Sequence, residues 1–325
     1  MSDFQDLPEE LILRILSYTE IKAFISCGQI STRIRRIRND NSLWMTVNIE
    51  KKIVKTELLE MILGKGCMIL NITNSVIMGS LTSNIKHQLR VLKLSIVEPS
   101  CRAVWTYCDE YLDVLEDLLF SCCSLQHLTL DGLGLSDKMT DGICKNGKTL
   151  QKLDLHKCES DFLDQILECC QELKQVNYND IEGYSDVQVD AQVLAKYIPT
   201  NVEILKLGNL DFRDDDVKFL LSRCNKIKAL HLEATLISDE SLTIIRHYLN
   251  LTLEELSLAD NKYISGTGFL ELKSMPSIKS LNLCNNNENC KEIQNLKQHL
   301  PHLMIRSSYP WENLYNKIQP KIGNF

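Results

Sequence analysis

A phrase with leucine or a similar apolar residue at its first, fourth and sixth positions recurs along most of this 325-residue chain. It is clearest at residues 125–130 and 150–155, and another clear copy lies at 89–94. Weaker copies lie at 67–72 and begin at Leu303. Seven successive copies start at Leu125, Leu150, Leu173, Val202, Ile227, Leu253 and Ile278. Their separations are 25, 23, 29, 25, 26 and 25 residues, so one short unit is repeated many times.

A period of this length is that of leucine-rich repeats, each of which supplies a short parallel strand and a returning helical segment. Alternation along each strand points the leucines inward and the intervening residues outward. Apolar spacing predicts helices at residues 137–145, 162–170, 214–222 and 238–249. Val47 and Ile49 predict a first strand ahead of the repeats. The predicted fold class is α/β: a leucine-rich-repeat solenoid (horseshoe) behind a small N-terminal domain of three helices.

Polar residues recur just after several of these strands. The third position after the last strand leucine is Cys158, Thr235, Asn261 and Asn286 in four copies, but Leu133, Ile181 or Leu210 in others. A polar group there can hydrogen-bond the turning backbone, so an incomplete ladder of such bonds is expected. Three residues are predicted to cap the N-termini of the returning helical segments: Asp214, Ser238 and Ser265.

Residues 7–44 predict the three helices of the N-terminal domain. Pro8 suits a first helical turn, and Glu9 and Glu10 favour its positive end. The third helix interleaves apolar residues with four arginines at positions 33, 35, 36 and 38. Helices this short cannot bury all of their apolar surface alone, so part of it should meet the repeats or a partner.

The segment LPEELILRILSY at residues 7–18, an Ile30-Ser31-x-Arg33 segment and a closing Ser42-Leu43-Trp44 together resemble an F-box. The resemblance implies docking onto the Skp-type adaptor of an SCF (cullin–RING) ubiquitin ligase, and through it onto the cullin and the RING subunit. F-boxes usually carry an aromatic residue where Ile34 stands. The other interpretation is a helical cap that seals the repeats. The implied adaptor-binding residues, as contacts or their support, are Leu7, Pro8, Leu11, Ile15, Leu16, Ile30, Ile34, Leu43 and Trp44.

The repeats are similar to those of the S-phase kinase-associated F-box protein family. The similarity lies in residues 123–137, 149–158, 300–305 and 320–324. It implies a substrate receptor that brings cell-cycle proteins, such as a cyclin-dependent kinase inhibitor, to the ligase. It also implies a small Cks-type accessory protein on the concave face that helps to hold a phosphorylated substrate. This chain has Asp180, Asp211 and Asp260 where the family has an aromatic residue and two arginines, and Ala234 at an acidic position.

The outward positions of the predicted strands are the candidate substrate contacts. This face is mixed and somewhat acidic, so a bare phosphate would need help from a basic partner. Fewer than about a third of such positions are expected to touch a partner. The predicted substrate-binding residues are Thr129, Asp131, Asp154, His156, Asn177, Asn179, Lys206, His231, Glu233, Ser257 and Asn282.

The predicted domains are the F-box domain at 1–50, the repeats at 51–306 and a C-terminal tail at 307–325. The tail is rich in aromatic residues and is interpreted as a cap over the last repeat or as a partner-binding strap. The interval between the copies at 89 and 125 is longer than the others. It holds either an inserted binding loop or a longer helix, which the spacing of Val114, Leu115, Leu118 and Leu119 favours.

Composition and missing motifs exclude several classes of function. The net charge of −7 provides no electrostatic footprint for nucleic acid, and no apolar run of membrane-spanning length occurs. No metal-binding, P-loop, dinucleotide or hydrolase motif appears, so no cofactor, metal or catalytic residue is expected. The thirteen cysteines lie mostly in apolar repeat segments and are interpreted as reduced, in a protein of the nucleus and cytoplasm. The alternative function is a repeat-type binding module or inhibitor without ligase linkage.

Overall fold

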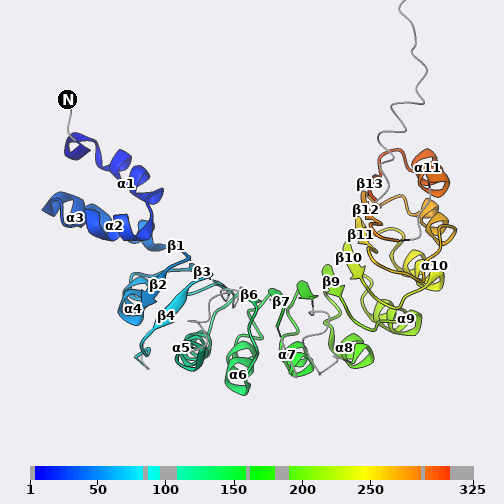
Figure 1. Ribbon diagram of the computed structural model, residues 1–325, viewed down its shortest axis with the longest axis horizontal. Helices are drawn as coiled ribbons and strands as arrows, with labels where there is room; N and C mark the ends of the chain where they lie inside the picture. The colour runs from blue at the N-terminus through cyan, green and yellow to red at the C-terminus, as the bar shows by residue number, and fades with distance from the viewer. Residues whose placement is uncertain are drawn as a thin grey trace, which may run out of the picture. The chain divides into compact units, whose positions relative to one another are not determined.

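The computed structural model describes residues 4–82, 87–95, 108–158, 162–179, 190–286 and 290–307. The chain forms two compact units, Met1–Leu150 and Gln151–Phe325. In each unit the parallel strands lie side by side, and the helices that connect them lie together on one side of the strands (Figure 1). The inserted segment at 96–107 and the tail beyond residue 307 lie outside the described residues.

The N-terminal helices are packed around one small apolar core. Ser31 caps the third helix by accepting a 3.2 Å hydrogen bond from the Ile34 amide. The core consists of Ile12, Leu16, Phe24, Ile34, Ile37 and Trp44, none of them more than 5% exposed. The elements are the 3-10 helix η1 (Phe4–Asp6), α1 (Glu9–Ser17), α2 (Ile21–Cys27), α3 (Thr32–Arg38) and the 3-10 helix η2 (Asn41–Trp44).

The rest of the first unit is a run of parallel strands in the order β1-β3-β5-β6. Their burial alternates, so that Leu70, Leu92 and Leu128 stack in register on the inside. A second, two-stranded parallel sheet joins β2 and β4. The elements are β1 (Thr46–Glu50), β2 (Ile53–Lys55), α4 (Thr56–Gly64), β3 (Ile69–Thr73), β4 (Val76–Met78), β5 (Val91–Ser95), α5 (Cys108–Ser121), β6 (His127–Asp131) and α6 (Asp137–Lys145).

The second unit continues the same plan, with strands in the order β7 to β13. Its first eight elements are β7 (Lys152–His156), α7 (Leu163–Cys169), β8 (Gln175–Asn179), α8 (Ala191–Tyr197), β9 (Ile204–Gly208), α9 (Asp214–Arg223), β10 (Ala229–Glu233) and α10 (Asp239–Leu249). The remaining elements are β11 (Glu255–Ser257), the 3-10 helix η3 (Gly268–Ser274), β12 (Ser280–Asn282), α11 (Cys290–His299) and β13 (Met304–Arg306).

The predicted period is confirmed, because a strand begins one or two residues after the start of every predicted copy, including those at 67, 89 and 303. The first strand at Val47 and Ile49 and the four predicted helices are also confirmed, within one residue at each end. The long interval before Leu125 contains helix α5, whose inner side buries Val114, Leu115 and Leu118.

A ladder of polar side chains runs beneath the strand ends of the second unit, as predicted. The buried Asn261 accepts from the Thr235 amide at 2.9 Å and donates to the carbonyls of Leu232 and Leu258 at 2.6 and 2.9 Å. Asn286 accepts from the Asn261 amide at 2.7 Å and so repeats the contact one turn later. These bonds satisfy backbone groups that turn away from the sheet and that water cannot reach.

One of the three predicted caps is wrong, because Asp214 is the first residue of α9 and does not cap it. Ser238 caps α10. Thr267 directly precedes η3, but the Ser265 hydroxyl accepts a 3.2 Å bond from the amide of Gly268, the first residue of that helix. The Asp214 carboxylate accepts hydrogen bonds from the amides and hydroxyls of Ser238 and Ser241 in the following repeat. Asp239 accepts from Ser265 in the same way. These residues therefore join neighbouring repeats.

Among the described residues, eight strands are followed by a residue with positive φ, two positions after the last buried leucine or isoleucine of the repeat. These residues are Lys51, Asn74, Gly132, Lys157, Asn209, Ala234, Asp260 and Asn285. Glycine and asparagine tolerate this left-handed conformation, whereas a Cβ without a local hydrogen bond makes it costly. Ala234, at φ +52°, has a Cβ and no side-chain group that could form a local hydrogen bond.

We expect Ala234→Gly to stabilise the protein by about 1 kcal/mol, because it removes the Cβ clash at positive φ while the Ala234 amide keeps its bond to the Ala259 carbonyl. Urea unfolding of the full chain measures the change. Ala229→Gly, in the ordinary conformation of β10, is the matched control and should destabilise. An equal loss of stability in Ala234→Gly and Ala229→Gly would show that the backbone at Ala234 is not strained.

We expect Asn261→Ala to destabilise the protein by about 3 kcal/mol or more, because it leaves the Thr235 amide and the Leu232 carbonyl buried without partners. Thermal unfolding followed by circular dichroism measures this effect. Asn282→Ala, on the outward side of β12, loses the bond to the Ser257 hydroxyl and a longer one, 3.3 Å, from the Cys284 amide, both in a half-buried setting, and should cost far less. Similar losses in the two variants would argue against the ladder as a stabilising element.

Candidate functional site

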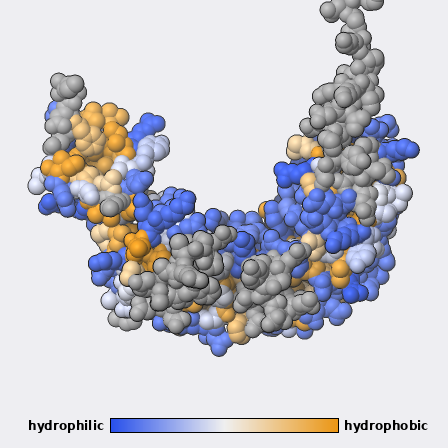
Figure 2. All heavy atoms as spheres, in the orientation of Figure 1, coloured by the Kyte–Doolittle hydropathy of each residue, from blue (hydrophilic) through white to orange (hydrophobic). Residues whose placement is uncertain are grey.

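The first candidate surface is an exposed apolar set on the N-terminal helices, which we call the α1 ridge: Leu11, Ile15 and Tyr18. Their side chains are 47%, 46% and 82% exposed, and their spacing of four and three residues places them on one side of α1 and its C-terminal end. Hydrophobic surface gathers on these helices in Figure 2. Large apolar side chains that remain this exposed mark interaction sites.

The structure divides the nine predicted adaptor-binding residues into two groups. Leu11, Ile15 and Ile30 are exposed, as is Pro8, and Leu7 and Leu43 are half-buried. Leu16, Ile34 and Trp44 are buried in the core of the three helices, at 5%, 0% and 1% exposure. These three side chains support the surface from beneath, and adaptor contact by the others stays a prediction.

Trp44 explains why the closing part of the motif is structural. Its ring lies 4.9 Å from that of Phe24, tilted by 58°, and its indole Nε1 donates a 2.7 Å bond to the Arg38 carbonyl. The burial of Ile34 also shows that the aliphatic residue at this position packs inside the domain. Its difference from the usual aromatic residue therefore does not remove an exposed contact.

The arginines of α3 hold the three helices together, which the sequence did not reveal. Arg33 donates to the Leu7 carbonyl at 2.8 Å, Arg35 to that of Gly28 at 3.0 Å, and Arg38 to that of Ile25 at 2.9 Å. Arg36 pairs with Glu9 of α1. Guanidinium groups suit carbonyls left open at helix ends, so these side chains are a scaffold for the α1 ridge.

The second candidate surface is the outward side of the strands. Of the predicted substrate contacts there, Asn179 is exposed, and Asp154 and Ser257 are buried at 6% and 2% exposure. The others are half-buried: Thr129 and Asp131 in the first unit, and His156, Asn177, Lys206, His231, Glu233 and Asn282 in the second.

Side chains on this surface bond mainly to one another across neighbouring strands. Asp154 pairs with Lys152 at 3.0 Å and accepts from Gln175 at 3.4 Å, and the His156 ring lies 3.4 Å from the Asn177 amide. The burial of Asp154 therefore removes it as a direct contact.

The same pattern recurs further along the second unit. The His231 ring and Glu255 are 2.8 Å apart, and Ser257 joins Glu233 to Asn282. The buried Ser257 therefore bridges its neighbours and is not available to a partner. The side chain of Lys206 makes no hydrogen bond or ion pair with the described residues, although its charge acts on His231.

A row of alternating charges borders the strand starts and was missed by the sequence reasoning. Lys228 lies 2.6 Å from Glu203, and Lys279 lies 2.5 Å from Glu254. The side-chain hydrogen bonds from Lys228 and Lys279 lower the pKa of Glu203 and Glu254. All four residues stand one position after a repeat start, so reading that column down the repeats would have revealed the alternation.

The residues that depart from the family pattern also lie at strand ends. Asp211 and Asp260 are exposed and Ala234 is half-buried, while Asp180 lies outside the described residues. Ala234 and Asp260 occupy left-handed turn positions. Two exposed carboxylates at this edge oppose direct binding of a phosphate group.

The cysteines support a structural role. All ten cysteines whose side chains are described are free thiols. Burial raises the pKa of Cys67 and Cys224 to about 11 and that of Cys122 and Cys170 to about 12, so these thiols stay protonated and unreactive. Among the described residues no cluster of metal-binding side chains occurs, and no helix there has the length and apolarity that a membrane crossing requires.

Comparison with known proteins gives the same two modules. Residues 4–50 match the F-box-like family, and residues 57–311 match the family described as the SKP2 LRR domain. An F-box joined to leucine-rich repeats is the architecture of substrate receptors of SCF-type ubiquitin ligases, which are generally non-catalytic. Because the second match covers most of its length, the chain belongs to the SKP2 leucine-rich-repeat family.

One solved structure supports the fold. The structure of the Rad7 and Elc1 complex in yeast has a chain with a TM-score of 0.55 and 18% identity, over 82% of this chain and 71% of that one. A chain of the TLR13-ssRNA13 complex has a TM-score of 0.43 and 19% identity, over 79% of this chain and 39% of that one. At 18% identity the first likeness is one of fold.

The environment of His231 leads to a test. Burial and the charge of Lys206 lower its pKa from 6.5, and they outweigh the opposing effect of Glu255 and Glu233. As the pH falls, His231 is therefore protonated in the unfolded chain before it is protonated in the folded protein. Neutral His231 contributes its full stabilisation above pH 6.5, and this contribution is lost as the pH falls from 6.5 through the lower pKa of the folded state.

We expect His231→Gln to lose less stability than the wild type when the pH is lowered from neutral through this range, as measured by urea midpoints. His247→Gln changes an exposed ring and serves as the control. Equal acid sensitivity in the wild type and His231→Gln would contradict the assignment.

Proposed function

We propose that this protein docks onto a Skp-type adaptor through the α1 ridge and Ile30, and holds a protein substrate against the outward side of its strands. The adaptor in turn connects it to the cullin and the RING subunit. The observation that carries the proposal is the exposure of Leu11, Ile15 and Tyr18 on one side of a helix that the buried core and the α3 arginines hold in place. Burying one such aliphatic side chain contributes about 1.5–3 kcal/mol.

We propose further that the substrates are cell-cycle proteins such as a cyclin-dependent kinase inhibitor. Membership of the SKP2 repeat family supports this substrate class. The strand side has paired charges and exposed carboxylates at Asp211 and Asp260, so a phosphorylated substrate would need basic groups from a Cks-type accessory protein. Buried, protonated thiols suit the reducing nucleus and cytoplasm, where we place the protein.

The alternative is a binding module without ligase linkage. The sequence favoured this alternative only through Ile34, which stands where F-boxes usually carry an aromatic residue. Ile34 is buried, so the difference does not remove an exposed adaptor contact and no longer favours the alternative. The two functions differ in one measurable respect: the alternative requires no adaptor contact.

We expect Leu11→Asp or Ile15→Asp to weaken adaptor binding at least about tenfold, because each places a charge in the apolar contact. Binding of the purified full chain to a Skp-type adaptor, measured by calorimetry, tests this. Leu251→Asp, at a side chain 76% exposed in the second unit, is the matched control and should bind as the wild type does. Trp44→Ala is unsuitable here because it removes a core ring.

Unchanged adaptor affinity in both ridge variants would overturn the docking proposal. Circular dichroism of each variant checks that the three helices remain folded.

For the substrate class, we expect the wild type in a reconstituted ligase to ubiquitinate a cyclin-dependent kinase inhibitor, and Leu11→Asp to lose this activity. The assay is run with and without a Cks-type protein and with phosphorylated and unphosphorylated inhibitor. The proposed substrate class would be refuted if Leu11→Asp still ubiquitinated the inhibitor. It would also be refuted if the wild type ubiquitinated no form of the inhibitor, with or without the Cks-type protein.

A further inference from the structure

Strand β1 stands at the end of the strand order of the first unit and pairs with β3 alone among the described residues. In a parallel ladder, alternate residues direct both the N–H and the C=O groups to the same neighbour. The Met45 carbonyl and the Lys51 amide bond towards β3, so the odd-numbered residues face that strand. Thr46, Asn48 and Glu50 therefore direct three amides and three carbonyls to the open edge.

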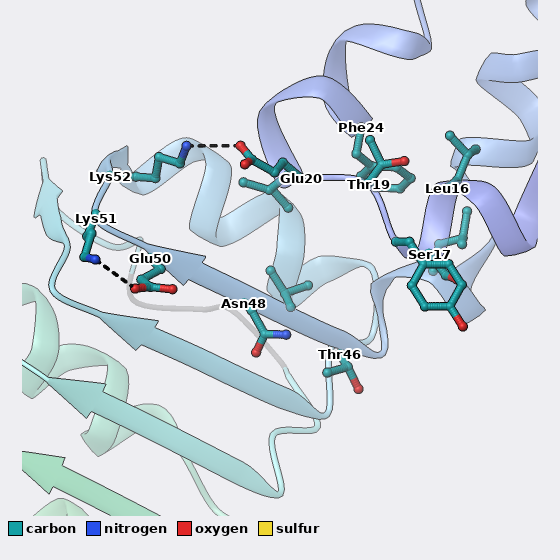
Figure 3. A pocket seen from close by; sticks show the side chains of 14 residues that line it. Leu16, Ser17, Thr19, Glu20, Phe24, Thr46, Asn48, Glu50, Lys51 and Lys52 are labelled. Carbon is teal, nitrogen blue, oxygen red and sulfur yellow. Dashed lines mark hydrogen bonds and ion pairs between the residues drawn. The ribbon is translucent and has the colours of Figure 1, made fainter.

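A groove of about 560 Å³ lies along this edge (Figure 3). Its far wall is the turn from α1 to α2, residues 17–20, and it includes Tyr18, the most exposed large apolar residue of the described chain. Phe24, Leu16 and Val47 line its base and are buried to 5% exposure or less. The groove therefore combines an apolar base with one edge of unpaired backbone groups.

The charges around the groove are balanced. Lys52 pairs with Glu20 at 3.3 Å across the groove, from the end of β1 to the α1–α2 turn, and Lys51 pairs with Glu50 at 3.4 Å. The Lys52–Glu20 pair is solvent-exposed, at 41% and 78%, so little energy is needed to open it. A neutral rim does not select for an acidic or a basic ligand.

Backbone donors and acceptors that repeat at every second residue of a strand match one chemistry, the backbone of another extended chain. Residues 17–20 form a wall opposite the edge, so an added strand would lie between that wall and β1. Edge strands that no helix or loop covers are known sites at which another strand can add to a sheet.

We propose that this groove binds an extended peptide segment of a protein partner, which adds a strand to the open edge of β1. Alternate side chains of the segment are apolar and β-branched and pack on the apolar lining that remains accessible, Tyr18 and Ile21. The intervening ones are polar and lie beside Asn48 and Glu50. The inference rests on β1 and its surroundings, and it stands whether or not the α1 ridge binds an adaptor.

The test uses the full chain and a pool of peptides of about eight residues, in which Val or Ile alternates with Thr or Ser. Hydrogen exchange is followed by NMR with and without the pool. We expect the amides of Thr46, Asn48 and Glu50 to exchange about tenfold more slowly with the peptides. Unchanged exchange at these three amides would overturn the proposal.

A matched pair of variants tests the same contact by affinity. Asn48→Pro removes the central outward amide, at a position where an edge strand tolerates proline, whereas Asn48→Ala keeps it. Both variants lose the side-chain bond from Asn71, so they differ mainly in the backbone. We expect Asn48→Ala to bind the pool as the wild type does, and Asn48→Pro to bind about tenfold more weakly.

Three other outcomes decide against the proposal. Equal peptide affinity in the proline and alanine variants would exclude strand addition. Protection of the three amides by a Skp-type adaptor alone, or by self-association seen in sedimentation, would assign the edge to that partner instead. If Asn48→Pro does not fold, the amide pattern of the wild type decides by itself.

Discussion

No single repeat of this protein can bury its own leucines, and the whole structure depends on that constraint. One strand and one helix leave an apolar side open, which only the next repeat in the same register covers. Leu205, Leu230 and Leu256 illustrate this arrangement, since they stack in register and are each 0% exposed. Stacking in turn leaves buried backbone at the strand ends, which Asn261 and Asn286 satisfy in the second unit.

The two sides of the strands are under different constraints, so their residues can change independently. Inward leucines are fixed by packing, because a cavity in a stacked core destabilises it by several kcal/mol. Outward residues such as Lys206 meet only solvent and their neighbours across the sheet. This separation explains how the chain matches the SKP2 repeat family through residues 57–311 and yet carries Asp211, Asp260 and Ala234 at positions that differ from the family pattern.

The fold could be predicted from the sequence because the period of the leucines recurs many times, so each copy supports the others. The helix caps were less predictable, because Asp214 contacts a serine in the next repeat and local spacing cannot show such a partner. The burial of Ile34 and Trp44 was hidden for a related reason. A motif shows which residues belong together, whereas only packing shows which of them face outward. The arginines of α3 bond to carbonyls, which have no side-chain signature in sequence.

The N-terminal helices show most directly how packing produces a binding surface. Their core is small, so only one side of α1 packs into it. Ile12 and Leu16 are buried on that side, whereas Leu11 and Ile15 on the other side stay exposed to solvent. Leaving two aliphatic side chains exposed forgoes about 1.5–3 kcal/mol each. Arg33 and Arg36 bond α3 to the start of α1, so the exposed side is held in a fixed position before any partner arrives. A preorganised apolar surface binds without an ordering cost, which is what a docking helix requires.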